Sequence, residues 1–280
     1  MPSGGGLYGE GRAKSSTALR VLRDRVARVQ GIVTTAQSGH FAEATELADR
    51  FGLRAEGREG RPLAELFAQG APVLVLAARR ADLYVAGRAF RASAGMAFLR
   101  VLRARRGEPD PLAAAAGLRA GDRVLDGTLG LGGDALVAAQ ATGERVIGLE
   151  KDGLLAAFTQ AGLRRLQKHG REPGHRVEVV RADHRAFLRA QPARSFDVVL
   201  LDPMFRRAGD AGPSFDLLRV HAEHAPLEAE TLREARRVAR RGVLVKDAAS
   251  GFELGRLGLV PRLTRRSAAI AFGWADSLVK

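Results

Sequence analysis

The stretch Arg123–Asp134, RVLDGTLGLGGD, decides the fold predicted for this chain. It begins with an apolar run that ends in the carboxylate of Asp126, and it continues through closely spaced glycines into the helix-like segment ALVAAQA at 135–141. Glycine lets the backbone turn tightly and approach a ligand closely, and a helix N-terminus presents unpaired amides at the same place. A buried strand that passes through glycines into a helix is how an α/β sheet builds a ligand site. The stretch therefore predicts a binding site at the carboxyl end of a strand.

Two further strand ends narrow this prediction. The glycine spacing at 130–133 is G-x-G-G, which lacks the third glycine of the dinucleotide fingerprint. A second strand-like run, Arg145–Leu149, ends in Glu150, where a carboxylate could hold the two hydroxyls of a ribose. A third run, Val198–Leu201, leads into Asp202–Phe205, sequence DPMF. After a strand, this tetrapeptide resembles the catalytic loop of class I S-adenosylmethionine (SAM)-dependent methyltransferases that act on exocyclic amino groups of bases. A structural glycine turn in another doubly wound fold is the weaker alternative, because it does not account for all three features in this order.

Strand-like and helix-like segments alternate from Arg123 onward, as a doubly wound, mostly parallel sheet requires. We predict strands near Val124, Val146, Val177–Val180, Phe196–Leu201 and Val243–Val245, and helices near Ala135–Ala141, Leu154–Gln167, His184–Ala190 and Leu227–Ala239. A final stretch, Ser267–Phe272, is expected to be the edge strand that closes the sheet. The predicted fold class is α/β, a Rossmann-like methyltransferase sheet of the seven-stranded type with a small N-terminal α/β domain.

The small domain is predicted over residues 17–94, before the main sheet. Its expected elements are helices at 17–29, 40–51 and 62–68, a strand at 31–35, and a hairpin of 73–76 with 82–85. Residues 1–16 are rich in glycine and serine and are expected to be a disordered tail. Residues 95–122 are expected to be a basic connector followed by a short helix at 111–116, and residues 123–280 form the predicted SAM-binding domain.

Composition excludes several classes of protein. There is no cysteine among the 280 residues, so disulfides and thiolate metal sites are excluded. His221 and His224 are spaced for one helix face but have no third ligand, so no metal site is expected. The chain shows neither an apolar signal-peptide core nor an apolar run near the ~20 residues that span a bilayer. A cytoplasmic protein without a membrane partner is therefore expected.

The net charge of +14 indicates a polyanionic partner, most simply nucleic acid. Of the 45 basic residues 40 are Arg. The planar guanidinium group of arginine can donate two hydrogen bonds to one phosphate. Codon bias in a GC-rich genome is the alternative explanation for the many arginines. It explains less well why the 45 basic residues outnumber the 31 acidic ones. Four arginines of the connector are predicted to contact RNA phosphates, with a solvated linker face as an equally favoured alternative: Arg100, Arg103, Arg105 and Arg106.

Roughly residues 71–280 resemble the ribosomal small-subunit RNA guanine-N2 methyltransferases of the RsmJ type. The stretches that carry the resemblance are Val73–Leu76, Gly95–Ala97, Arg106–Glu108, Asp126–Ala135, Leu149–Glu150 and Leu201–Phe205. The resemblance implies a SAM-binding sheet with a small domain and methyl transfer to the exocyclic amine of a guanine, with ribosomal RNA or the small ribosomal subunit as partner. The chain departs from the family at 206–212, RRAGDAG, where the family is Lys-rich, and at Asp247–Gly251, where the family has a Pro-rich basic loop.

The predicted site residues fall into three groups. The cofactor group is Asp126, Thr128, Gly130, Gly132, Gly133, Asp134, Glu150, Lys151, Asp183 and Asp202. The catalytic group is Asp202, Pro203 and Phe205. The RNA group adds Lys246 to the four arginines, with capping of its strand as the alternative role of this lysine. Asp183 is expected either to bond the adenine amino group or to cap a helix, and the two roles are compatible.

The catalytic assignment follows from the weak nucleophilicity of the guanine N2 amine, whose lone pair is delocalised into the ring. A carboxylate at Asp202 would accept its N–H bond, aim the lone pair and disperse positive charge. Pro203 would fix the loop, and Phe205 would offer a face on which an unpaired base stacks. Positioning carries most of such a displacement at carbon, so no metal is required. The alternatives are a methyltransferase of a protein or small-molecule substrate, and a non-catalytic RNA-binding protein that retains the fold.

Overall fold

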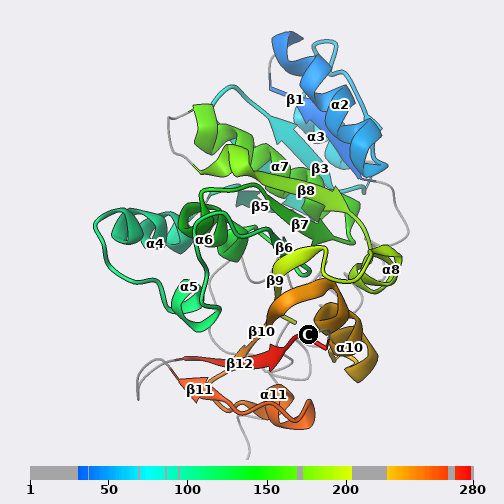
Figure 1. Cartoon of the computed structure of the whole chain (residues 1–280). Helices are drawn as coiled ribbons and strands as arrows, with labels where there is room; N and C mark the ends of the chain where they lie inside the picture. The colour runs from blue at the N-terminus through cyan, green and yellow to red at the C-terminus, as the bar shows by residue number, and fades with distance from the viewer. Residues whose placement is uncertain are drawn as a thin grey trace, which may run out of the picture.

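Two β-sheets organise the chain (Figure 1). The computed structural model describes residues 31–36, 38–68, 70–85, 87–93, 95–168, 173–203, 226–263 and 269–278. The predicted tail at 1–16, the predicted helix at 17–29, His221, His224 and Phe205 lie outside the described residues. One sheet, near the N-terminus, has five strands and the other has seven.

The five-stranded sheet has the order β2-β1-β3-β4-β5. Its elements are β1 (Ile32–Thr35), α2 (Phe41–Phe51) after a 3₁₀ turn (Ser38–His40), β2 (Arg54–Ala55), α3 (Leu63–Ala68), β3 (Val73–Leu76), β4 (Ala81–Val85) and β5 (Arg88–Arg91). β1 pairs in parallel with β2 and β3, while β3, β4 and β5 are antiparallel. The predicted hairpin is therefore confirmed, and β2 and β5 are additional strands.

The seven-stranded sheet has the order β11-β12-β10-β9-β6-β7-β8. Its strands are β6 (Val124–Asp126), β7 (Val146–Glu150), β8 (Val177–Arg181), β9 (Phe196–Leu201), β10 (Ala239–Ala248), β11 (Arg262–Leu263) and β12 (Ile270–Asp276). The pairs from β10 through β9, β6 and β7 to β8 are all parallel. The predicted doubly wound α/β sheet is confirmed.

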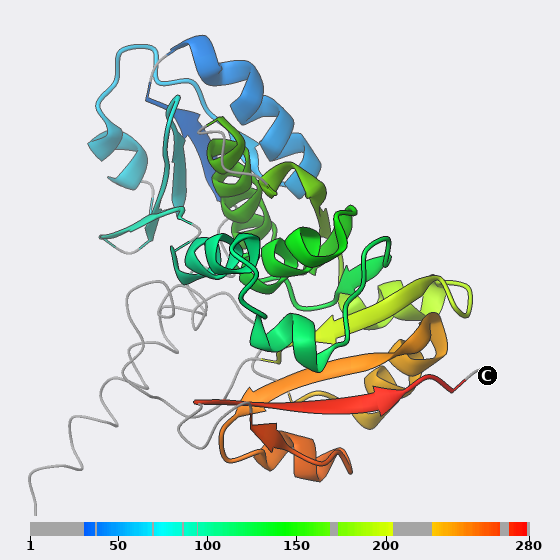
Figure 2. The ribbon, with the colours of Figure 1, turned by 60° about the vertical axis from the view of Figure 1, so that its left-hand side comes forward.

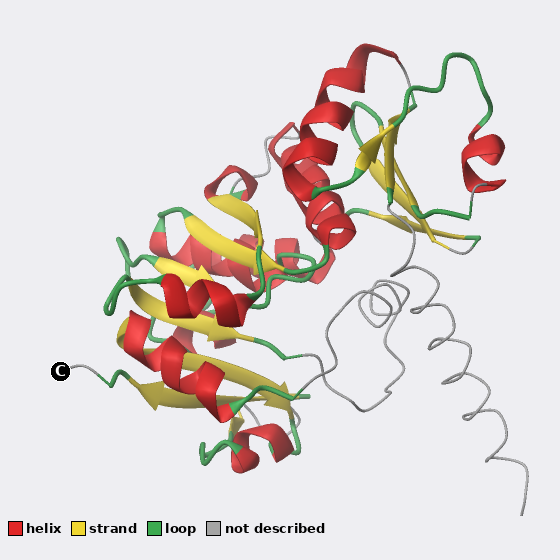
Figure 3. Ribbon diagram, turned by 90° about the vertical axis from the view of Figure 1, so that its right-hand side faces the viewer, coloured by secondary structure: helices red, strands yellow, loops and turns green. Residues whose placement is uncertain are grey.

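Helices cover both faces of this sheet (Figure 3). They are α5 (Pro111–Ala115), α6 (Gly133–Thr142), α7 (Gly153–Lys168), α8 (His184–Ala190), α10 (Ala229–Val238) and α11 (Phe252–Arg256). Alternate residues of each strand enter two separate cores: Val198 and Leu200 of β9 pack with α6 and α7, whereas Val199 and Leu201 pack with α10. This alternation is what a strand buried on both faces requires.

The prediction of an edge strand at Ser267–Phe272 was wrong in one respect. The strand forms as β12 and is antiparallel to β10, but β11 pairs with its outer side, so β12 is not at the edge. The two-residue β11 has too short an apolar pattern to be recognised as a strand from sequence.

The basic connector predicted from residue 95 is instead a helix, α4 (Gly95–Arg105), that packs against α6. Ala97 and Val101 are four residues apart and form its buried face. The approach is close, since a Cβ on Gly133 of α6 would lie 3.4 Å from the Cβ of Ala97. The many arginines on the other faces obscure this short apolar stripe in the sequence.

Helix α7 joins the two sheets, as the views in Figures 1 and 3 agree. The side chain of Arg165 is only 4% exposed; it pairs with Glu43 of α2 and donates to the carbonyl oxygen of Ala77 after β3. Arg181, at the end of β8, donates to the carbonyl oxygen of Phe51 at 2.7 Å. Two arginines that donate to backbone oxygens, the buried Arg165 and the exposed Arg181, therefore fix the small unit on the large sheet. The exact domain boundaries at 94 and 122 stay a prediction.

None of the helices in the described ranges combines the length and the apolar character that a membrane span requires.

We expect Gly153→Ala to lower the free energy of unfolding by about 1–3 kcal/mol, the usual cost of overpacking. A Cβ at Gly153 would come within 2.3 Å of the carbonyl oxygen of Phe51, which is backbone and cannot rotate away. Urea unfolding measures the change. Gly255→Ala in α11 is the control: its Cβ would meet nothing within 4 Å, so stability should stay equal or rise by up to about 1 kcal/mol. Equal midpoints for Gly153→Ala and the wild type would contradict this account of the junction.

Candidate active site

Three neighbouring parallel strands end at one edge of the large sheet and carry the charged residues of the site. Asp126 ends β6 opposite Leu200, and β9 continues from there to Asp202. β10 pairs Val245 with Leu201, which brings Lys246 beside Asp202. The carboxyl ends of parallel strands are where such folds bind ligands. The structure thus brings Asp126, Asp202 and Lys246 together, although they are far apart in sequence.

The glycine turn between β6 and α6 has the backbone conformation that the sequence predicts. Gly130 and Gly132 have φ angles of +52° and +76°, in the left-handed region that favours glycine. The hydroxyl of Thr159 on α7 donates to the carbonyl oxygen of Gly130 at 2.7 Å, and a Cβ on Gly132 would lie 3.3 Å from Cγ2 of the same threonine. The turn is therefore held closely against α7, and a side chain at Gly132 would press on Thr159.

Glu150 at the end of β7 reaches this turn. Its Oε2 accepts from the Gly130 amide at 3.2 Å, and its Oε1 accepts from the Asp152 amide at 2.9 Å. Burial raises the pKa of Glu150 to about 7. Burial, reinforced by the nearby charge of Asp134, also raises the pKa of Asp126 to about 7. Two carboxyl groups that sit beside the glycine turn therefore titrate near neutral pH.

An alternating row of charges connects the site to α4 and α5. Lys246 Nζ donates to Asp202 Oδ2 at 2.6 Å and to Asp134 Oδ2 at 2.7 Å. Arg100 Nη1 donates to Asp134 Oδ1 at 2.7 Å, and its Nε and Nη2 donate to the two oxygens of Asp110 at 2.8 and 2.9 Å. Asp110 also caps α5 by accepting from the amides at the start of that helix. We name these five residues the charge row.

The pKa shifts in the charge row show which charges hold it together. Burial alone would lower the pKa of Lys246, but the carboxylates of Asp202 and Asp134 raise it well above its usual range. Burial would raise the pKa of Asp134, but Lys246 and Arg100 lower it. Burial raises the pKa of Asp202 and prevails over the opposing charge of Lys246. Lys246 is therefore a permanent cation shared between two carboxylates.

The residues predicted to bind RNA divide into two kinds. Lys246 and Arg100 direct their charges inward to carboxylates, with side chains only 16% and 27% exposed. Arg103 and Arg106 are exposed on and just after α4, and Arg105 donates to Gln140 of α6. The part that the sequence did not reveal is the pairing of Arg100 with Asp110. The Asp-Pro dipeptide at 110–111 is a helix-start signal that could have identified the cap.

Asp183 follows β8 and caps α8, so the predicted helix-cap role is confirmed. Its Oδ1 accepts from the Arg185 amide at 2.9 Å, and its carboxylate pairs with the Arg185 and Lys151 side chains at 2.8 and 3.0 Å. The hydrogen bond from Arg185 lowers the pKa of Asp183 far below its usual value. The role of Asp183 and Lys151 toward an adenine stays a prediction.

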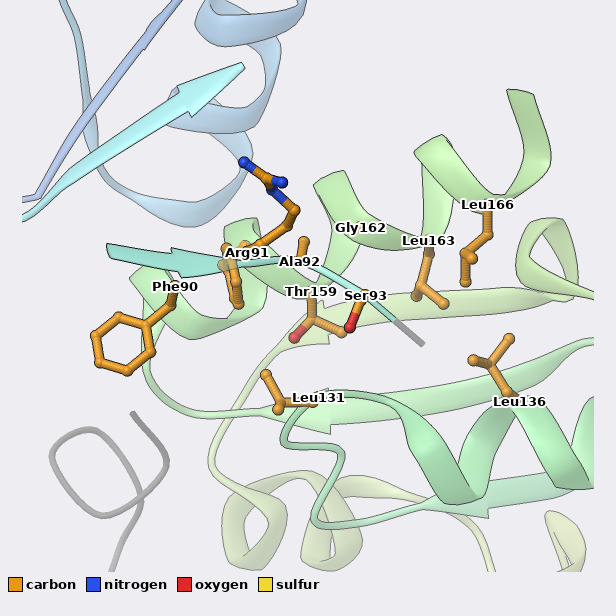
Figure 4. A pocket seen from close by; sticks show the side chains of 11 residues that line it. Phe90, Arg91, Ala92, Ser93, Leu131, Leu136, Thr159, Gly162, Leu163 and Leu166 are labelled. Carbon is orange, nitrogen blue, oxygen red and sulfur yellow. The ribbon is translucent and has the colours of Figure 1, made fainter. Parts of the chain in front are cut away.

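A cavity between the glycine turn and the small unit is too small for a cofactor. Figure 4 shows Leu131 of the turn, Thr159 and Leu163 of α7, and Phe90 and Ala92 of the β5 segment around it. Its volume is about 30 Å³, which is room for about one water molecule. It is a gap in the packing of the two units. Within the described residues, no group of three His, Asp or Glu side chains is arranged to hold a metal ion.

The family model described as "Putative SAM-dependent methyltransferase" matches residues 89–254. The chain belongs to this family of SAM-dependent methyltransferases. The matched region runs from β5 to α11 and includes the glycine turn, Glu150 and the whole charge row.

Several proteins are similar to this methyltransferase. "Uncharacterized protein YpiP" of Bacillus subtilis is 37% identical over 186 residues, which are 62% of this chain and 70% of that protein. Ribosomal RNA small subunit methyltransferase J of Alkalilimnicola ehrlichii is 40% identical over 106 residues, 37% of this chain and 40% of that protein. The enzyme of the same name from Laribacter hongkongensis is 37% identical over 147 residues, 50% of this chain and 52% of that protein. The chain thus spans about half the length, or less, of these two enzymes.

A solved structure shares the fold over nearly the whole chain. The SAM-dependent methyltransferase NGO1261 from Neisseria gonorrhoeae superposes with a TM-score of 0.60 at 20% identity, over 89% of this chain and 97% of that one. SAM is the cofactor of the family. The residues at this edge fit SAM: glycines in the left-handed region permit close approach, and the half-buried carboxyl group of Glu150 lies beside them.

We expect Glu150→Ala to weaken SAM binding by about 1–3 kcal/mol, because ribose hydroxyls would lose their acceptor. Binding should also depend on pH. The pKa of Glu150 is about 7, so roughly a tenth of it is ionised near pH 6. An ionised acceptor binds hydroxyls better, so the Kd for SAM should fall as pH rises through neutrality and then level off. Calorimetric titrations at several pH values measure this, and Glu150→Gln should flatten the profile. If Glu150→Gln kept the wild-type pH dependence of SAM binding, the placement of the ribose at Glu150 would be wrong.

We expect Lys246→Met to destabilise the fold by about 3–5 kcal/mol, because the largely buried carboxylate of Asp134 and the partly buried one of Asp202 would lose their shared cation. Without the lysine, the pKa values of Asp134 and Asp202 would rise above those in the unfolded chain. The native state would then hold more protons than the unfolded state, so the stability loss should grow as pH rises. Urea unfolding at acidic and alkaline pH measures this difference. A loss independent of pH would show that Lys246 contributes packing rather than charge.

Proposed function

We propose that this methyltransferase modifies an exocyclic amine of a base in small-subunit ribosomal RNA, with guanine N2 as the acceptor. The relatives named ribosomal RNA small subunit methyltransferase J support the choice of substrate. The net charge of +14 supports a polyanionic substrate. The observation that carries the proposal is the fixed carboxylate of Asp202 at the edge of the sheet beside the glycine turn.

Asp202 is held at two points. Its amide donates to the Thr128 hydroxyl at 2.6 Å, and its Oδ2 accepts from Lys246 at 2.6 Å. Within the described residues, Oδ1 accepts no hydrogen bond, and a third of the side chain is exposed. That oxygen is free to accept the N–H of an incoming amine. Lys246 and Thr128 thereby act as positioning residues for the carboxylate.

The chain's own residues supply geometry and electrostatics. When bound, SAM supplies a methyl group activated by its sulfonium charge. Asp202 accepts the hydrogen bond of the amine, directs its lone pair toward that methyl group, and disperses the positive charge that develops on nitrogen. A fixed carboxylate needs no reorganisation during the reaction, which is why its attachment to Lys246 matters. Phe205 remains our candidate for stacking on the base.

Exposed arginines next to this edge are the proposed contacts to the RNA backbone. Arg100 ties α4 to Asp134 at the start of α6. Arg103 and Arg106 follow it by three and six residues, which is about 5–9 Å along a helix. They are therefore within reach of phosphates that flank a base at Asp202, whereas Arg100 itself is assigned to the structure of the site.

Deletion of the gene and complementation with variants tests the proposal. Mass spectrometry of small-subunit RNA nucleosides should show loss of one methylguanosine on deletion and its return with the wild-type gene. Asp202→Ala should restore none of it, although SAM affinity in vitro should stay within a few fold. Asp202→Asn keeps the shape but removes the charge, and its turnover should fall by about 10²-fold.

Asp197→Asn is the matched control, because Asp197 lies at the opposite end of β9 and pairs with Arg240. It should restore methylation fully. An unchanged nucleoside profile after deletion would remove the proposed substrate. Wild-type turnover in Asp202→Ala would contradict the proposed mechanism, in which Asp202 holds the amine that is methylated.

A further inference from the structure

A hollow of about 480 Å³ lies between α5 and the strands beyond the charge row. Pro109, Pro111 and α5 form the wall of the hollow, and Leu244, Phe272 and Trp274 of β10 and β12 form its floor. α5 packs beside β12, and both lie on the same side of the molecule (Figure 2). Asp110, between the two prolines, is turned inward to Arg100, so this wall presents no charge to the hollow.

The register of the strands joins this hollow to the catalytic edge. Lys246 pairs with Phe272, and Phe272 pairs in turn with Arg262 of β11. Residues directly paired on adjacent strands lie on the same face, about 5 Å apart from strand to strand. Asp202, Lys246, Phe272 and Arg262 therefore follow one another across a single face of the sheet. The hollow begins next to the lysine that holds Asp202.

The floor of the hollow is aromatic and rigid. Trp274, the single tryptophan of the chain, is half-buried. A Cβ on Gly242 would lie 2.5 Å from its ring atom Cζ2, so the absence of a side chain there gives the indole its place on the sheet. Its Nε1 donates to Asp276 at 2.8 Å, which fixes the orientation of the ring. A fixed aromatic face is a platform on which nucleobases stack.

We propose that this hollow binds an unstacked base of the RNA substrate, a neighbour of the base at Asp202, with Arg262 on its phosphate. The exposed Arg262 is the one charged residue among those that line the hollow in the described part of the chain, and its charge complements RNA. Apolar walls and an aromatic floor suit a base that has left its stack. This inference rests on the proposed function, because it requires an RNA substrate.

Trp274 reports on the hollow directly, because it is the only tryptophan in the chain. In the free protein, acrylamide should quench its fluorescence. Small-subunit RNA from the deletion strain, or a short single-stranded oligoribonucleotide, should shift the emission and shield it from acrylamide. The same oligoribonucleotide paired in a full duplex should change neither property, since its bases stay stacked.

Variants of Trp274 and Arg262 distinguish the contribution of base stacking to RNA binding from that of the phosphate contact. Trp274→Leu should weaken RNA binding about tenfold, as loss of one stacked base does, with unchanged SAM affinity. Trp274→Phe keeps an aromatic face and should stay close to the wild type. Arg262→Gln should reduce the slope of log affinity against log salt by about one. Arg145→Gln is the matched control, because Arg145 is exposed at the opposite edge of the sheet and pairs with Glu178; it should leave the slope unchanged.

Each other outcome has a definite meaning. If RNA binds and is methylated while Trp274 emission and acrylamide access stay constant, the hollow is not a base site and the proposed function stands. If RNA does not bind at all, both fail. If Trp274 is already shielded in the free protein, the chain itself fills the hollow and the inference is overturned. Should Trp274→Leu fail to fold, the wild-type emission and the salt slope of Arg262→Gln still decide.

Discussion

The site depends on one ammonium group placed between two carboxylates. Lys246 binds Asp134 at the start of α6 and Asp202 at the end of β9, and all three are largely withdrawn from water. Removing such charges from water is costly unless each finds a partner in good geometry. The lysine therefore holds α6, the end of β9 and β10 in one arrangement. Arg100 and Asp110 extend that arrangement to α4 and α5.

The same constraint separates the functions along the edge of the sheet. On one side of the charge row lie the glycine turn and Glu150, our candidate cofactor site, with carboxyl groups whose pKa values lie near neutrality. On the other side, the row continues into Phe272 and the hollow above Trp274. Asp202 stands between them. The register of β10 on β9 and of β12 on β10 gives Asp202 this place, and buried hydrophobic faces fix that register.

Much of the fold could be predicted because its signals are local. The long strands, helices α6, α7, α8 and α10, and the glycine turn follow from periodicity and from glycines in the left-handed region. β2 and β11 could not be predicted, since two residues carry no period. At α4 the sequence favours a connector, because the apolar stripe is short and arginines surround it.

The sequence by itself determined the α/β class, the glycine turn between β6 and α6, and the carboxylates that end three strands, because neighbouring residues specify each of these features. Only the tertiary structure decided what the cations do. Lys246 meets Asp202 and Asp134 across separations of 44 and 112 residues, and Arg100 meets Asp134 across 34. An arginine that faces RNA and one that faces a buried carboxylate are identical in a sequence. The register of β10 on β9 and the packing of α4 on α6 distinguish them, because Coulomb attraction between charges acts through space and not along the chain.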